Sequence, residues 1–279
     1  MAAEGGLLTS DPEPLVFARP AGGLAYVDEG PRDAPVLFTL HGIPGSVRDF
    51  RYLAPLLTDQ VRLVRVDLPG FGGSAPDETA TRSLRGRGQA ILDLADHLGV
   101  ERFGLVGHSM GGGPALLLGA RARARVSHLV LLASVGLTRH RGLGPSPLAF
   151  RAFGRALDLP GVGWLLAPLA RRAYRRRRFP GADRMTARDL SVQIRAIGAL
   201  DFDELGQAVA AGLPPTLVAF CRDDHMLEEA IPEALVRCIP GAQNLAFRDG
   251  GHNLQKTRAP EIASAILDFL GGAPLHGPP

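Results

Sequence analysis

The chain is poor in cysteine, and no hydrophobic run in it is long. Cys221 and Cys238 are the only cysteines among 279 residues, which is too few for a disulfide framework, and their apolar surroundings are typical of buried thiols. No stretch approaches the roughly 20 apolar residues of a membrane-spanning helix. Residues Met1 to Pro14 carry acids but lack the basic run and apolar core of a signal peptide. These absences predict a protein of the reducing cytoplasm.

Lysine is almost missing as well. Lys256 is the only lysine among 31 basic residues, so nearly all of the positive charge is arginine. The formal net charge is only +3, which argues against a global attraction to nucleic acid, and no reading module or aromatic interleaving accompanies the arginines. Hydrophobic residues make up 46% of the chain, enough to bury a sizeable core in one large α/β domain or two smaller ones.

Short apolar runs alternate with helical patterns along most of the chain. The runs predicted as strands are 15–17, 24–27, 35–40, 61–66, 103–106, 129–133, 216–220 and 244–247. The first two are separated by a glycine-containing turn and predict an N-terminal hairpin. Helical patterns cover about 81–98, 228–238 and 260–270. Because strands alternate with helices and several strands are continuously apolar, we expect an α/β fold with a mostly parallel, doubly wound sheet.

The alternation stops after Gly136. From residue 137 to 212 there is no buried-strand pattern, only helical patterns interrupted by Pro145, Pro147, Pro160, Pro168 and Pro180. This segment predicts a helical cap inserted over the sheet after the sixth strand. The core is then divided into residues 1–136 and 213–270, and residues 271–279 are predicted to be a disordered tail.

The sequence Gly-His-Ser-Met-Gly at 107–111 lies between an apolar strand pattern and a helical stretch. A strand that turns directly into a helix strains the residue at the turn, and the flanking glycines remove side chains that would collide. This context is what a nucleophile elbow requires, and it disfavours the alternative of a glycine-rich turn without chemistry. We therefore expect Ser109 to stand above the sheet with its hydroxyl exposed.

Four motifs occur in a fixed order. They are His-Gly-Ile-Pro at 41–44, Asp-Leu-Pro-Gly-Phe-Gly-Gly-Ser at 67–74, the segment 107–111, and a late Asp and His. In this combination the chain resembles the α/β-hydrolase superfamily over roughly residues 15–270. The His-Gly-x-Pro form is similar to that of the branch with epoxide hydrolases, haloalkane dehalogenases and related esterases. The first two use an aspartate nucleophile where this chain has Ser109, so the resemblance implies a capped serine hydrolase.

A serine nucleophile needs a base, and the base needs an acid to orient it. The resemblance implies the chain order serine, acid, histidine, and it places the acid at Asp224, three residues after Cys221. The neighbouring Asp223 is the alternative acid and is otherwise interpreted as a solvated loop residue. His252 follows two glycines after the last predicted strand, from where it can reach over the sheet. It is therefore the predicted general base.

The oxyanion of an acyl transfer intermediate needs two donors. The backbone N–H of Met110, at the start of the helix after the elbow, is predicted to be one of them. The resemblance implies the backbone N–H of Ile43 as the other, with Pro44 shaping the loop. His41 and His108 are interpreted as rings packed around this loop and the elbow.

Other chemistry is not indicated by the sequence. The glycine-rich stretch 70–74 lacks both a G-x-G-x-x-G pattern and a Walker lysine, so it predicts a structural turn near the pocket. No histidines, cysteines or acids occur at metal-ligand spacing. We expect neither a metal nor a cofactor.

The cap has two features of its own. Its apolar residues, Trp164 and Phe153 among them, are candidate contacts for an acyl group, although packing within the cap is the alternative for most of them. Its arginines are Arg171, Arg172, Arg175, Arg176, Arg177, Arg178, Arg184 and Arg188, with Asp183 as the only acid between them. A solvated helix face is the default interpretation of such a run. The mutual repulsion of the Arg171–Arg178 cluster makes an acidic partner the alternative: an acyl carrier protein, a phosphate-bearing thioester or an anionic membrane.

These features together predict a hydrolase that cleaves a carboxylic ester or thioester through an acyl-serine intermediate. The same triad also supports carbon–carbon bond hydrolysis, perhydrolysis and acyl transfer. A non-catalytic homologue that binds a small ligand is a further alternative. These possibilities differ in pocket shape and in access of water, which the motifs do not encode.

Overall fold

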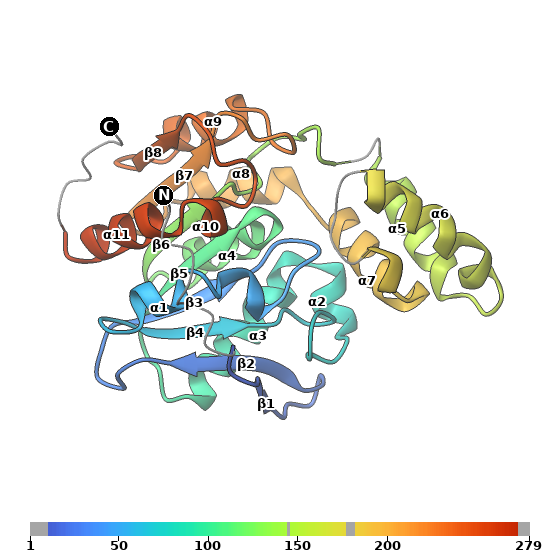
Figure 1. Cartoon of the computed structure of the whole chain (residues 1–279), viewed down its shortest axis with the longest axis horizontal. Helices are drawn as coiled ribbons and strands as arrows, with labels where there is room; N and C mark the ends of the chain where they lie inside the picture. Colours follow the sequence, from blue (N-terminus) through green and yellow to red (C-terminus); the bar gives the residue numbers. More distant parts are fainter. Residues whose placement is uncertain (1–10, 144–145, 177–181, 273–279) are drawn as a thin grey trace, which may run out of the picture.

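A computed structural model describes residues 11–143, 146–176 and 182–272. It has one eight-stranded sheet in the order β1-β2-β4-β3-β5-β6-β7-β8 (Figure 1). The strands are β1 (Leu15–Phe17), β2 (Leu24–Glu29), β3 (Val36–Leu40), β4 (Arg62–Val66), β5 (Phe103–His108), β6 (Val126–Leu132), β7 (Thr216–Cys221) and β8 (Gln243–Phe247). The pairs β1–β2 and β2–β4 are antiparallel, and all other neighbours are parallel. The predicted parallel sheet with an N-terminal hairpin is thus confirmed.

Helices cover both faces of this sheet. One face packs on α3 (Leu84–His97), α4 (Gly112–Arg121), α8 (Phe202–Ala210) and α9 (Ala230–Cys238), and the other on α1 (Ala54–Leu57), α10 (Leu254–Thr257) and α11 (Ala259–Leu270). Side chains of the central strands alternate between these two cores: in β3, Phe38 lies in the first and Leu37 in the second. Because successive side chains of a buried strand enter different cores and both cores are apolar, the strand sequences are continuously apolar.

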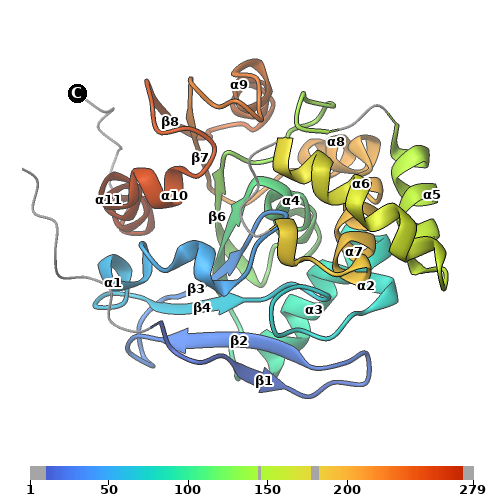
Figure 2. The same ribbon diagram turned by 45° about the vertical axis from the view of Figure 1, so that its right-hand side comes forward.

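A helical insert separates β6 from β7, as the sequence predicts. It consists of α5 (Pro147–Asp158), α6 (Val162–Arg176), the short helix η3 (Ala182–Arg184), α7 (Ala187–Gly198) and α8. Helices α5, α6 and α7 share a small core of their own, which includes Leu157, Ala170 and Ile194. Figure 2 shows α5, α6 and α7 together beside the sheet, with α2 below them. Within the insert, no strand is found among the described residues.

Two helix predictions need correction. The predicted helix 81–98 is two helices, α2 (Glu78–Arg82) and α3, because Ser83 is extended (φ −149°) and its Oγ accepts the N–H of Gly86 at 3.0 Å as an N-cap. The predicted break at Pro168 is also wrong, since α6 continues through it. Proline has no N–H, so Pro168 cannot donate to the carbonyl of Trp164 four residues earlier. Both residues are exposed, so water can replace this hydrogen bond.

Some sequence predictions fall on residues outside the described part. These are residues 273–279 of the predicted tail, and Pro145, Pro180, Arg177 and Arg178. Where the chain is described, none of its helices combines the length and the apolar character needed to cross a membrane. There is likewise no group of three or more histidine, cysteine or acidic side chains in that part that could hold a metal ion.

The two cysteines differ in environment, which corrects the expectation that both are buried. Cys221, at the end of β7, is buried, but Cys238, at the end of α9, is exposed. Burial, and to a smaller extent the nearby Asp223, raises the pKa of Cys221 to about 12. The Cys221 thiol therefore stays neutral at pH 8, and the thiolate is the reactive form.

We expect iodoacetamide at pH 8 to alkylate Cys238 in the folded protein and to leave Cys221 unmodified. Peptide mass mapping after a short exposure measures both sites, and alkylation in denaturant provides the control in which both react. Because the pKa of Cys221 is higher in the folded state than in the unfolded state, its contribution to stability is lost as pH rises from about 9 towards 12. Equal labelling of the two thiols in the folded protein would contradict this description.

Candidate active site

Ser109 occupies the sharp turn between β5 and the helix that follows it. Strand β5 ends at His108, a short helix η2 (Ser109–Gly111) makes the turn, and α4 starts at Gly112. Ser109 has φ of 52°, a left-handed conformation that is uncommon for residues other than glycine. The backbone strain predicted for an elbow is therefore present at this serine.

Two glycines make the turn possible by their lack of a side chain. A Cβ on Gly107 would lie 2.7 Å from the Cα of Gly112, and one on Gly111 would lie 2.2 Å from the carbonyl oxygen of Leu40. Both contacts are with backbone, which cannot move aside without opening the turn. The glycines thus let strand, turn and helix close on one another, as the motif predicts.

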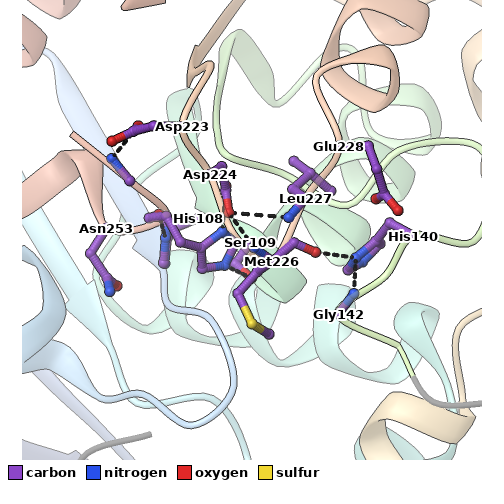
Figure 3. A network of polar contacts seen from close by, with 12 residues as sticks. His108, Ser109, His140, Gly142, Asp223, Asp224, Met226, Leu227, Glu228 and Asn253 are labelled. Atoms are coloured by element: carbon purple, nitrogen blue, oxygen red, sulfur yellow. Dashed lines mark hydrogen bonds and ion pairs between the residues drawn. The ribbon is translucent and has the colours of Figure 1, made fainter. Parts of the chain in front are cut away.

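Ser109, His252 and Asp224 form a continuous chain of hydrogen bonds. The Ser109 Oγ lies 2.8 Å from His252 Nε2, and His252 Nδ1 lies 2.7 Å from Asp224 Oδ2. Because a carboxylate only accepts, Nδ1 carries the proton and Nε2 accepts the hydroxyl proton of Ser109. Ser109 follows the end of β5 and Asp224 follows the end of β7, and Figure 3 shows these two residues near each other. His252, which is 143 residues from Ser109 and 28 from Asp224, bonds to both. This places the three predicted residues in mutual contact.

Asp224 is fixed in an ionised state by its own neighbours. It is 5% exposed, and its Oδ1 accepts the backbone N–H groups of Met226 at 2.7 Å and Leu227 at 3.1 Å. Burial alone raises the pKa of Asp224, but the hydrogen bond from His252, the positive charge that this ring carries when protonated, and these two N–H groups outweigh it and lower the pKa. The carboxylate is therefore charged at neutral pH, as the orienting acid of a triad must be.

Asp223 has a role that the sequence analysis missed. Instead of standing free in solvent, its carboxylate accepts the backbone N–H of Gly250 at 3.2 Å and of Gly251 at 2.8 Å. These two glycines have positive φ and directly precede His252. Adjacent acids on the β7 loop thus hold the histidine loop in two ways, with Asp223 bound to its backbone and Asp224 to its ring. No local sequence pattern marks this contact, because the glycines are 27 and 28 residues away.

Replacing Asp223 with alanine is expected to lower hydrolytic turnover about 10-fold to 100-fold, because a displacement of about 1 Å in a catalytic group can cost that much. Asp223 forms its bonds on an exposed loop, so the thermal midpoint should change little. The matched control is Asp249→Ala, which removes an acid of the histidine loop itself that pairs with Arg258 and should leave turnover near the wild-type level. Wild-type turnover in Asp223→Ala would show that the histidine loop keeps its conformation without the hydrogen bonds from Asp223.

His108 lies beneath the base and is kept neutral. It is 3% exposed, and burial together with the charge of His252 lowers its pKa to about 3. Its Nε2 donates to the backbone carbonyl of His252 at 2.9 Å, and its Nδ1 lies 3.4 Å from the Gln255 amide. The ring therefore supports the backbone of His252 and is not free to act as a base, which agrees with its interpretation as a packed ring.

The loop after β3 lies against the nucleophile. A Cβ on Gly42 would be only 3.0 Å from the Cβ of Ser109, so this glycine allows the loop and the serine to approach closely. The next residue, Ile43, lines a cavity together with Ser109 and Met110. The two residues predicted to supply oxyanion donors are thus both beside the serine. The fully buried His41 packs its edge on Phe71 and accepts the N–H of Leu68 at 3.0 Å.

The glycine-rich stretch 70–74 is a turn organised by Asp67. The Asp67 carboxylate accepts the N–H of Val47 at 2.6 Å and of Gly73 at 2.7 Å, and Ser74 Oγ donates to the Asp67 carbonyl. A Cβ on Gly72 would overlap the Asp67 carboxylate. The N–H groups of Gly70, Phe71 and Ser74 are likewise bound to backbone carbonyl oxygens, which fits the structural interpretation of this turn.

The cavity beside Ser109 is small, and the insert forms part of its wall. Its volume is about 50 Å³. Its lining comes from the core (Ile43, Ser109, Met110, Met226 and His252), the β6–α5 loop (His140, Gly142 and Leu143) and the insert (Phe150, Tyr174 and Ile197). Burial lowers the pKa of His140, and its Nδ1 donates to the Met226 carbonyl at 3.0 Å. Apart from the triad, the wall is therefore mostly apolar with one neutral ring.

Trp164 and Phe153 are not in this cavity, which corrects their prediction as substrate contacts. Trp164 is 79% exposed on the outer side of α6, and Phe153 packs against the core of the insert. The reason is helical phase: α6 turns Gly163, Ala167, Ala170 and Tyr174 inward, and Trp164 lies outside that stripe. The insert residues that do line the cavity are Phe150, Tyr174 and Ile197, which lie on the sides of their helices that face it.

Comparison with known proteins identifies the family of this chain. The chain belongs to the alpha/beta hydrolase family, whose sequence profile matches residues 36–265. It is 28% identical to a 2-hydroxy-6-oxononadienedioate/2-hydroxy-6-oxononatrienedioate hydrolase of Cupriavidus pinatubonensis, over 85% of this chain and 87% of that protein. It is 27% identical to the magnesium-chelatase 30 kDa subunit of Rhodobacter capsulatus, over 88% and 90% of the two chains.

Solved structures share the fold. The crystal structure of the enol-lactonase from Burkholderia xenovorans LB400 superposes with a TM-score of 0.73 at 22% sequence identity, covering 92% of this chain and all of that one. A hydrolase from Pseudomonas aeruginosa PA01 gives the same score and identity, with 92% and 98% coverage. The predicted α/β-hydrolase fold with an inserted helical segment is thereby confirmed.

Proposed function

We propose that this chain is a serine hydrolase that cleaves a carboxylic ester or thioester through an acyl-serine intermediate. The observation that carries the proposal is the hydrogen-bond chain from Ser109 through His252 to the buried Asp224. A serine hydroxyl in contact with an unprotonated imidazole nitrogen, whose other nitrogen is held by a carboxylate, is the arrangement that activates a nucleophile.

The first half of the reaction acylates the serine. His252 Nε2 takes the proton as Ser109 Oγ attacks the acyl carbon, and Asp224 stabilises the imidazolium that forms. The negative charge on the acyl oxygen is received by the backbone N–H groups of Met110 and Ile43. The tetrahedral intermediate then collapses, and His252 returns the proton to the departing alcohol or thiol.

The second half releases the acid. A water molecule enters where the alcohol or thiol left, gives its proton to His252 Nε2, and attacks the acyl carbon. Collapse of the second tetrahedral intermediate restores the Ser109 hydroxyl and frees a carboxylic acid. Each half uses His252 once as base and once as acid, so the enzyme ends in its starting state.

Substrate entry requires the insert to move. Pockets that bind small molecules usually have about 300–1,000 Å³, several times the cavity volume of about 50 Å³. Phe150 of α5 and Tyr174 of α6 form part of the wall, so an outward shift of α5 and α6 enlarges it. We therefore assign the insert the role of a cap, with Phe150, Tyr174 and Ile197 as its contacts to the acyl group.

The test is a panel of p-nitrophenyl esters and acyl thioesters of increasing acyl length, assayed with wild type and Ser109→Ala. Serine-dependent release of p-nitrophenol or thiol supports the proposal. A 2-hydroxy-6-oxo-dienedioate belongs in the panel because of the similarity to the Cupriavidus hydrolase. Turnover of that compound alone favours carbon–carbon bond hydrolysis, and turnover of nothing by a folded, probe-reactive protein favours acyl transfer or ligand binding.

A further inference from the structure

Large apolar side chains are exposed on α5, on the turn after it and on α6. They are Leu148 (73% exposed), Leu159 (55%), Val162 (36%), Trp164 (79%), Leu165 (66%) and Leu169 (60%). In the described part of the chain, only three other large hydrophobic residues are exposed: Leu15, Val16 and Tyr52. Single exposed apolar residues are ordinary, but six within 22 residues mark a surface that binds something.

Helix α6 has apolar residues on its inner side and also on the first half of its outer side. Gly163, Ala167, Ala170 and Tyr174 face the neighbouring helices at spacings of three and four residues. Leu165, Leu169, Arg172 and Arg176 repeat on the opposite side at the same spacings and are exposed. We call Trp164, Leu165, Leu169, Arg172 and Arg176 the outer face of α6. A surface helix normally has a polar outer side, whereas this one is apolar in its first half and cationic in its second.

The charge around this face is predominantly positive. Residues 148–176 contain six arginines and a single acid, Asp158, which already pairs with Arg195 at 2.8 Å. Arg175 pairs with Asp183 at 2.9 Å, but within the described residues no carboxylate lies in ion-pair distance of Arg172 or Arg176. The unpaired guanidinium groups therefore lie on the same strip as the exposed leucines.

A surface hollow adjoins the outer face. It has a volume of about 480 Å³ and is lined by Trp164, Leu165, Ala167, Pro168, Arg171, Thr186 and Ala187. Apolar walls with an arginine at one side suit a molecule with a hydrocarbon part and an anionic part. Figure 1 shows α6 as the outermost helix of the insert, at the opposite end of the molecule from α11, where a flat surface can approach it.

We propose that the outer face of α6 binds the surface of an anionic lipid bilayer. Trp164, Leu165 and Leu169 enter the boundary between headgroups and acyl chains, while Arg172 and Arg176 extend to lipid phosphates. Tryptophan favours this boundary because its ring is apolar and its N–H is polar. A second copy of the chain is a poor occupant, because a twofold contact would join two cationic faces and offer no unpaired carboxylate from residues 148–176 to Arg172 or Arg176. This proposal does not depend on the reaction that Ser109 performs.

Trp164 is the only tryptophan of the chain, so its fluorescence reports on this face alone. The full chain is mixed with vesicles of equal parts phosphatidylglycerol and phosphatidylcholine, or of phosphatidylcholine alone, and bound protein is separated by flotation. We expect binding to the anionic vesicles, a shift of Trp164 emission to shorter wavelength, and weakening of both by added salt. No flotation with anionic vesicles, or equal flotation with both kinds, overturns the proposal.

Two double variants locate the binding. Arg172→Gln with Arg176→Gln is expected to lower the affinity for anionic vesicles about 30-fold, and Leu165→Gln with Leu169→Gln should lower it at least 10-fold. The matched controls, Arg82→Gln with Arg237→Gln and Leu15→Gln with Val16→Gln, change equally exposed residues elsewhere and should bind as wild type.

Unchanged melting temperatures establish that the outer-face variants fold. If they bind vesicles as tightly as the controls, the outer face of α6 is not the membrane contact and the proposal fails. If the wild type binds an acidic protein, such as an acyl carrier protein, and ignores vesicles, the arginines serve a protein partner and the proposal also fails.

Discussion

Replacing Ser109 with alanine is expected to lower ester turnover by about a millionfold, to the level that binding and the oxyanion donors alone provide. Among the residues that the structure describes, the Ser109 hydroxyl is the only nucleophile in hydrogen-bond contact with His252 Nε2. The measurement is kcat on the best ester of the panel, with product detected over hours. KM should change little, because the acyl contacts of Phe150, Tyr174 and Ile197 remain.

Ser146→Ala is the matched control for this substitution. Ser146 caps α5 by accepting the N–H of Ala149, outside the hydrogen-bond chain of the site, so its loss affects stability by about 1 kcal/mol and turnover little. If Ser109→Ala retains more than a few per cent of wild-type turnover, the acyl-serine mechanism is wrong.

Asp224→Asn is expected to lower kcat about 10⁴-fold while the fold stays intact. The reason is the direction of the hydrogen bonds. Oδ1 of Asp224 accepts the N–H groups of Met226 and Leu227, so an asparagine must keep its carbonyl oxygen there and turn its amide towards His252. The amide then donates to Nδ1, the imidazole proton moves to Nε2, and Nε2 no longer accepts the proton of Ser109.

Asp223→Asn is the matched control, since it makes the same chemical change at the adjacent residue. Its remaining carbonyl oxygen still accepts from the histidine loop, so the loss should stay far below that of Asp224→Asn. The pKa of Asp224 is lowered in the folded state, so its stabilising effect is present above pH 4 and is lost as pH falls. Equal loss of kcat in both variants would contradict the assignment of Asp224 as the orienting acid.

The sheet and its elbow could be predicted because each rests on local sequence. Buried strands such as β3 are continuously apolar, and the glycines at 107 and 111 are required by contacts within one turn. These features depend on the backbone path of one or two neighbouring elements. The position of Asp224 came from the resemblance to the family, since the end of β7 alone is followed by two candidate acids, Asp223 and Asp224.

Other features depend on contacts between distant segments. Asp223 binds Gly250 and Gly251, which are 27 and 28 residues away, and no local pattern distinguishes it from a solvated acid. Trp164 was assigned to the wrong side because composition, without the phase of α6, does not say which apolar residue faces inward. Ser83 is a residue type that often caps the start of a helix, here at Leu84. The apolar pattern of the predicted helix 81–98 did not reveal the break at this serine.

The most direct test of the central claim is labelling with a fluorophosphonate probe. The probe bonds its phosphorus to an activated serine oxygen and releases fluoride, so it needs no knowledge of the substrate. Our account predicts rapid labelling of the wild type at Ser109, mapped by peptide mass, and loss of labelling in Ser109→Ala and His252→Ala. A folded wild type that does not react, or that reacts equally well without His252, would contradict the claim that this hydrogen-bond chain activates the serine.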